Sequence, residues 1–128
     1  MVTLALGIRV LLHGLVHVWY IVLSRGWVTF QPSMGWTGRS WLLTPWLGER
    51  GTGWLATLGY GAAALGLSVV GVGLVAGLPR APAALPWAAL LSAGVIIMFW
   101  DAKWDKVVQK GLVGLVLDTA LVVVSFWF

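Results

Sequence analysis

Long apolar segments separated by short polar links dominate the pattern of this chain. Crossing about 30 Å of hydrocarbon takes about 20 helical residues, and four segments are long enough. None of them alternates apolar and polar residues, as the strands of a transmembrane barrel do. The pattern predicts an all-α, polytopic membrane protein in which residues 1–128 form a single transmembrane domain, with helices at residues 2–23, 54–78, 83–100 and 107–128.

The links between these helices differ in length and composition. Pro79 and Pro82 mark a short link between the second and third helices, and short links make antiparallel neighbours. We therefore expect an antiparallel four-helix bundle. The link at residues 24–53 is long and rich in Trp, a residue that prefers the headgroup level of a membrane. We expect an interfacial loop here; a lid over a cavity is the alternative. The Trp residues of this link are Trp27, Trp36, Trp41 and Trp46.

The distribution of Lys and Arg predicts the orientation of the chain. The side of the membrane opposite the first and third links carries only Arg80. By the positive-inside rule, the first and third links face the cytoplasm and both termini are non-cytoplasmic, in a prokaryotic cytoplasmic membrane. The basic residues of the two links are Arg25, Arg39, Arg50, Lys103, Lys106 and Lys110.

Composition agrees with a membrane location. The chain has 128 residues, of which 60% are hydrophobic and 9% charged. A soluble domain this small could not bury so much apolar surface, so the lipid bilayer is its expected partner. The net charge of +4 comes from scattered residues, without the basic cluster of a nucleic-acid-binding protein. The chain has no Cys, which excludes disulfides and cysteinyl metal sites.

Titratable residues inside the apolar segments are the candidate site. A charged side chain in hydrocarbon costs about 2.5–3.5 kcal/mol on insertion scales, so it normally faces protein and marks a site. Four polar residues share an arc of about 80° on the first helix, and an aspartate shares a face with small residues on the fourth. We expect an Arg9–Asp118 or a His13–Asp118 contact within a ligand-binding pocket or proton relay. Its residues are Arg9, His13, His17, Tyr20 and Asp118.

Two cofactor hypotheses and a structural one compete with this interpretation. His13 and His17 lie one turn apart and could bind a metal with Asp118, although Gly14 stands where zinc peptidases have glutamate. Two histidines on one helix cannot take opposite axial positions on a haem, so a haem needs a second chain or Met98. The same polar residues could instead only satisfy one another and set the register of the helices.

The link after the third helix carries a second polar group. Asp101 and Asp105 lie one turn apart, and paired carboxylates can hold a cation. Lys103 and two further lysines surround them, which predicts a solvated, charged cytoplasmic rim.

The second helix has two nearly opposite faces of small residues, which let helices approach closely in lipid. One face could pack against a second copy, so we expect a homo-oligomer or a larger membrane complex.

Three stretches carry a resemblance to a known group of proteins. They are RVLLHGLVH at residues 9–17, WDAK at 100–103 and GLVGLVLD at 111–118. Together they resemble uncharacterised small bacterial four-span membrane proteins with H-G-x-x-H in the first helix and a later D-[GA]-K…G-x-x-G-x-x-[IL]-[ND] pattern. Members are sometimes labelled transporter permeases. The resemblance implies the four-span architecture and points to His13, His17, Asp101 and Asp118, but it implies no activity. The layout is also similar to DoxX-like proteins, in topology alone.

The function expected from these features is non-enzymatic. We expect an accessory subunit or a small binding or transport unit for a proton, a quinone, a lipid or another small ligand. One alternative is a metal- or haem-dependent redox enzyme that uses His13, His17 and Asp118 as ligands. The other is a purely structural subunit of a larger membrane complex.

Overall fold

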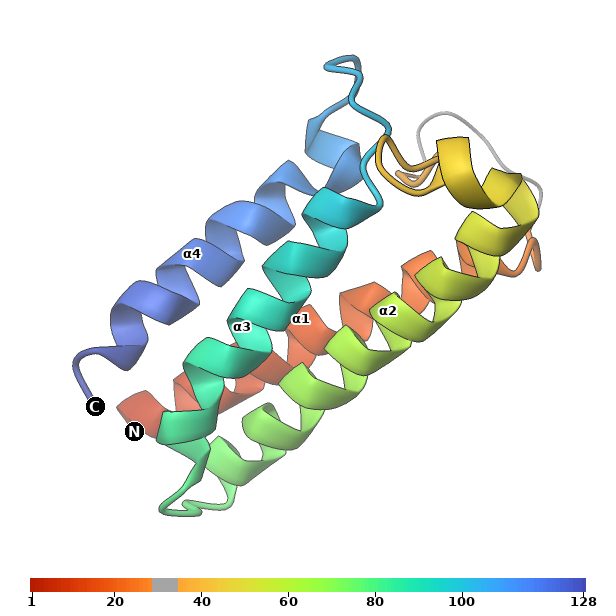
Figure 1. Cartoon of the computed structure of the whole chain (residues 1–128). Helices are drawn as coiled ribbons and strands as arrows, with labels where there is room; N and C mark the ends of the chain where they lie inside the picture. The colour runs from red at the N-terminus through yellow and green to blue at the C-terminus, as the bar shows by residue number, and fades with distance from the viewer. Residues whose placement is uncertain (29–34) are drawn as a thin grey trace.

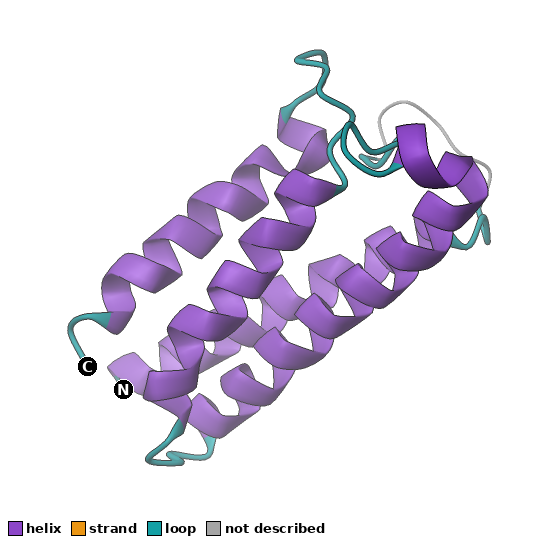
Figure 2. Ribbon diagram, viewed as in Figure 1, coloured by secondary structure: helices purple, strands orange, loops and turns teal. Residues whose placement is uncertain are grey.

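The computed structural model describes residues 1–28 and 35–128, and this part of the chain is helical without a strand (Figure 2). Four of its segments are long and apolar enough to cross a membrane, so the chain is a small multi-pass membrane protein. Both termini lie at the same end of the bundle (Figure 1). The predicted four-helix architecture is confirmed. Its elements are α1 (Val2–Ser24), α2 (Thr44–Val75), α3 (Ala81–Met98), the π-helix η2 (Val108–Leu112) and α4 (Val113–Ser125).

Helix α2 begins ten residues earlier than the apolar pattern predicts. Its first turn, at Thr44, contains Pro45, whose missing N–H is no loss at the start of a helix. Gly48 then interrupts the helical backbone with φ 68°. The Thr52 hydroxyl donates to the Gly48 carbonyl oxygen at 2.7 Å and braces this kink. The expected interfacial loop is therefore shorter than 24–53, and its residues 29–34 lie outside the described residues.

The helices pack in chain order, α1 on α2, α2 on α3 and α3 on α4. On one side of α2, a Cβ added to Gly71 would lie 2.7 Å from the Leu11 nitrogen of α1. On the other side, a Cβ on Gly59 would lie 2.9 Å from the Phe99 ring, just after α3. Both small-residue faces of α2 are thus covered within one chain. Neither face is left open at these positions, and the expected homo-oligomer stays a prediction.

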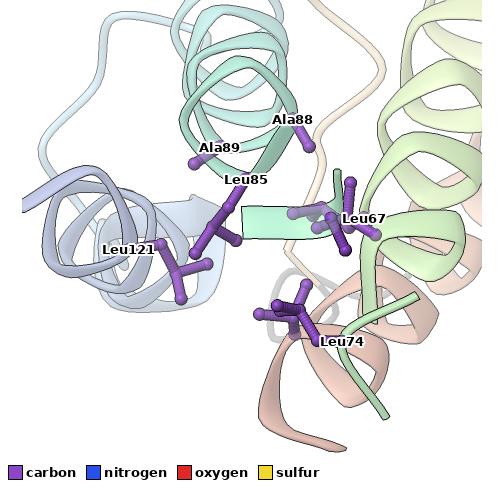
Figure 3. Close-up of a cluster of buried hydrophobic side chains, with 9 residues drawn as sticks. Leu67, Leu74, Leu85, Ala88, Ala89 and Leu121 are labelled. Carbon is purple, nitrogen blue, oxygen red and sulfur yellow. The ribbon is translucent and has the colours of Figure 1, made fainter. Parts of the chain in front are cut away.

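Two apolar clusters hold the bundle together. The cluster nearer the termini joins all four helices and includes Val10 and the Leu and Ala side chains labelled in Figure 3. The cluster at the other end is aromatic: the Tyr20 and Tyr60 rings stack with their centroids 4.8 Å apart. Trp36 belongs to this cluster, and its indole N–H donates to the Phe99 carbonyl at 2.9 Å. This tryptophan is therefore a buried core residue rather than a headgroup anchor.

The segment around Trp41 ties the loop end of the bundle to α3. Its indole N–H donates to the Ile97 carbonyl at 2.8 Å, and its backbone N–H donates to the Trp100 carbonyl at 2.7 Å. Trp27 and Trp46 are exposed, as expected for headgroup anchors. The Trp-rich link thus both closes the end of the bundle and presents indoles outward.

The α1–α2 contact can be tested with a pair of glycine variants. Gly71→Ala forces a methyl group against the α1 backbone and should lower the free energy of unfolding by about 1–3 kcal/mol. Gly94→Ala is the matched control because a Cβ there meets nothing within 4 Å, and its effect should stay within about 0.5 kcal/mol. Unfolding in detergent, followed by circular dichroism, measures both. Equal stability of the two variants would contradict the close α1–α2 packing.

Candidate functional site

Four buried polar side chains meet at the centre of the bundle: His13 and His17 of α1, Ser92 of α3 and Asp118 of α4, here called the polar cluster. Their exposed fractions are 7%, 1%, 0% and 1%. Each of them lies one helical turn from a residue of an apolar cluster, such as Val10 before His13. The polar cluster therefore sits between the two apolar clusters, far from either end of the helices.

Hydrogen bonds connect all four members of the polar cluster. His13 Nε2 donates to Asp118 Oδ1 at 2.8 Å, and Ser92 Oγ donates to Asp118 Oδ2 at 2.7 Å. The Ser92 hydroxyl also lies 2.8 Å from His17 Nε2. His17 Nδ1 is 3.3 Å from the His13 carbonyl oxygen. Of the two contacts predicted for Asp118, with Arg9 or with His13, the structure shows the one with His13, which joins α1 to α4.

The number of protons in the polar cluster follows from these contacts. Ser92 has a single hydroxyl proton, and donating it to Asp118 requires His17 Nε2 to donate to Ser92. Every contact is satisfied when His17 carries both ring protons and Asp118 is ionised. It is equally satisfied when one proton has moved through Ser92 to Asp118, leaving both groups uncharged. Both arrangements have no net charge, as an apolar interior requires.

Two of the expected site residues lie outside this network. Arg9 is exposed and takes no part in the hydrogen bonds around Asp118, so the predicted alternative, an Arg9–Asp118 contact, does not form. It lies at the margin of the buried face of α1, near the end of the helix, where its long side chain can reach the headgroups. Tyr20 is buried next to His17, and its hydroxyl donates to the Gln109 carbonyl at 3.1 Å.

Ser92 is the site residue that the sequence analysis missed. It is the single hydroxyl-bearing residue of α3 (Ala81–Met98), an otherwise apolar helix. Serine is common at helix contacts in membranes as a small residue, so its presence alone does not mark a site. Its isolation in an uncharged helix is a signal that could have indicated a buried partner.

The geometry does not assemble the predicted metal or haem ligands. Within residues 1–28 and 35–128, no three His, Cys, Asp or Glu side chains are arranged to hold a metal ion. Both ring nitrogens of His17 are already in hydrogen bonds. Met98 is 39% exposed at the end of α3, six residues beyond Ser92. The set His13, His17 and Asp118 therefore forms a hydrogen-bonded network rather than a ligand sphere.

A pocket of about 220 Å³ lies beside the polar cluster, between α1 and α4. The two helices meet mainly through side chains, because neither packs closely on the other's backbone. Several lining residues, such as Val16 and Val113, are each 53% exposed on the outside of the bundle. The mouth of the pocket therefore faces lipid. Its lining residues are His13, Val16, His17, Tyr20, Ile96, Val108, Gly111, Val113, Gly114 and Leu117.

The charged rim after α3 contains one enclosed ion pair, while Lys103, Asp105 and Lys106 around it are exposed. Lys110 Nζ lies 2.9 Å from Asp101 Oδ2, and these side chains are only 6% and 7% exposed. Lys110 also contacts Asp105, which is 70% exposed, at 3.2 Å. The backbone N–H of Lys103 donates to Asp101 Oδ1 at 3.0 Å, while its side chain plays no part. The cation that the paired carboxylates hold is thus the ammonium group of Lys110.

Burial and hydrogen bonding act in opposite directions on Asp101. Desolvation raises the pKa of its carboxyl, but hydrogen bonds from Lys110 and from the Lys103 backbone outweigh this effect. The net result is a pKa below the ordinary value of 3.8. The ionised form of Asp101 therefore stabilises the folded state more than the protonated form does.

The fold and the site together define a small multi-pass membrane protein with a carboxylate–imidazole–hydroxyl network at its centre. Searches against protein-family models, curated proteins and solved structures find no match to this chain.

Removing the Ser92 hydroxyl tests the network. Ser92→Ala leaves Asp118 Oδ2 and His17 Nε2 without their partner and should destabilise the protein by about 1–3 kcal/mol. Thr119→Ala is the control, since this exposed hydroxyl donates within its own helix, to the Leu115 carbonyl. It should change stability by less than about 0.5 kcal/mol. If chemical unfolding in detergent gave equal values for both variants, Ser92 would not bridge the cluster.

The ion pair at the rim predicts a dependence of stability on pH. Because the folded-state pKa of Asp101 is depressed, its contribution is complete above about pH 4 and is lost as the pH falls through the folded-state value. Asp101→Asn should therefore weaken the acid loss of stability, measured as the midpoint of thermal unfolding between pH 6 and pH 3. Glu49→Gln, at an exposed pair with Arg39, should leave the acid limb nearly as steep as in the parent protein.

Proposed function

We propose that this protein is a non-catalytic membrane binding unit that holds a small membrane-soluble molecule in the pocket between α1 and α4. The observation that carries the proposal is the pocket itself, because it adjoins the polar cluster and opens toward lipid. Binding pockets for small molecules are mostly apolar with a few polar groups that orient the ligand. Here the His13 ring supplies such a group, and the side chains of His17 and Tyr20 form part of the pocket wall.

The arrangement of the walls supports entry from the membrane. A molecule dissolved in the bilayer can pass between the exposed side chains of Val16 on α1 and Val113 on α4 without leaving hydrocarbon. The base of the pocket includes Ile96 of α3. An apolar ligand therefore exchanges one apolar environment for another, and the polar contacts decide which molecule is retained.

Binding is better supported than transmembrane proton conduction. The hydrogen-bonded chain of the polar cluster ends at His17 Nδ1 and the His13 carbonyl oxygen. Tyr20, the next polar residue on α1, donates to the Gln109 backbone rather than to His17. Among the described residues, no continuous chain of hydrogen-bonded side chains runs from the cluster to either end of the bundle.

The orientation and context of the chain belong to the same proposal. The basic residues of the first and third links support a cytoplasmic location for the loop end, with both termini on the opposite side of a bacterial membrane. The resemblance to small four-span bacterial proteins is consistent with an accessory subunit that delivers or retains its ligand for a larger complex.

Competitive photolabelling in lipid nanodiscs tests the pocket. The probe is 3-phenyl-3-trifluoromethyldiazirine, a small apolar carbene precursor, and 4-hexylphenol is the competitor. We expect competitor-sensitive labelling at pocket residues, mapped by mass spectrometry. Val16→Trp should fill the mouth and reduce this labelling at least fivefold. Leu15→Trp is the control, because Leu15 is similarly exposed, at 52%, but does not line the pocket. Labelling that is insensitive to the competitor along all lipid-facing surfaces would refute the proposal.

A further inference from the structure

One nitrogen of the His13 ring is left for a ligand. Its Nε2 is bonded to Asp118, and no described residue forms a hydrogen bond with its Nδ1. Within the described chain, Nδ1 is unpaired but not fully buried, so it borders open space. The adjoining ring carbon, Cε1, faces Gly114, at 3.7 Å from the position of an added Cβ. Both residues line the pocket, so a side chain only 6% exposed presents an unpaired nitrogen to it.

Hydrogen bonding to Asp118 determines what this nitrogen can do. The carboxylate oxygen accepts, so the ring proton of neutral His13 is on Nε2 and Nδ1 is an acceptor. The proton shift through Ser92 leaves His13 unchanged, because that shift passes between Asp118 and His17. The pocket therefore requires a hydrogen-bond donor from its ligand.

We propose that the ligand is an aromatic hydroxyl compound, a phenol or hydroquinone ring with an apolar substituent, whose O–H donates to His13 Nδ1. This inference rests on the proposed binding function. A dry cavity of about 150 Å³ accommodates benzene, so a pocket of about 220 Å³ has room for one substituted ring. A phenolic O–H is more acidic than an aliphatic one and forms the stronger bond to a basic imidazole. The lipid-facing mouth leaves room for an alkyl tail.

The donor set distinguishes this ligand from a metal ion. A protein metal site needs three or more ligands, and the polar cluster offers the pocket one free nitrogen. His17 has none left, since Nδ1 faces the His13 carbonyl and Nε2 faces Ser92. Tyr20 adds a hydroxyl that is already donating to the Gln109 backbone. A single acceptor in an apolar pocket fits one hydroxyl group.

A matched pair of probes tests the hydroxyl requirement on the full chain in nanodiscs. The phenol 4-hexylphenol has the donor, and 4-hexylanisole replaces its hydrogen with a methyl group. The phenol should protect the pocket from photolabelling at about tenfold lower concentration, because one hydrogen bond is worth about 1–1.5 kcal/mol. It should also shift the ¹⁵N resonance of His13 Nδ1 in histidine-labelled protein, which the anisole should not do.

Variants separate this inference from the binding proposal. Tyr20→Phe should keep the preference for the phenol, since His13 is the acceptor, and Val16→Trp should abolish protection by both compounds. Equal protection by the two compounds, still lost in Val16→Trp, would overturn the hydroxyl inference while leaving the binding pocket in place. Protection by neither compound would overturn both. A preference that disappears in Tyr20→Phe would assign the acceptor of the ligand hydroxyl to Tyr20 instead and refute the role of His13.

Discussion

A carboxylate in the middle of a hydrocarbon layer must find hydrogen-bond donors within the protein, and the centre of this structure is organised around that requirement. Asp118 of α4 takes one donor from α1, His13, and one from α3, Ser92. His17 continues the network and allows the whole group to remain without net charge. Unpaired, each of these groups would oppose insertion and packing. Paired, they join α1, α3 and α4 at one depth of the bundle.

The same interaction explains why a pocket exists at this position. Glycines bring α1 and α2 into backbone contact, whereas α1 and α4 are joined mainly by the reach of His13 to Asp118. Because side chains make the contact between α1 and α4, the contact joins the two helices but also keeps their backbones apart. The space that remains beside it lies next to a free imidazole nitrogen and opens toward lipid. The network that satisfies the buried carboxylate thus also leaves a pocket suited to an apolar molecule with a polar group.

The loop end of the bundle also encloses charged groups, and there an ion pair satisfies them. Lys110 stands at the start of the fourth span, and its ammonium group is enclosed by Asp101 with help from Asp105. Gly111 follows with φ 116°, and an added Cβ would lie 2.6 Å from the Ile96 side chain. The chain therefore turns tightly into α4 at a position that only glycine fits. This turn and the buried Trp36 side chain together close the end of the bundle that lies near the pocket.

Apolar segment lengths determine most of this architecture by themselves, because each span must bury its own backbone polar groups as a helix. Helical periodicity and depth also predicted that Asp118 has a partner on α1, either Arg9 or His13, and the structure shows His13. They could not place Arg9, which lies close to the same stripe but beyond the edge of the buried face. Nor could they show that Ser92 completes the network, or that both small faces of α2 are already occupied. Those features depend on how far each helix is rotated toward its neighbours, and packing between distant segments decides that rotation.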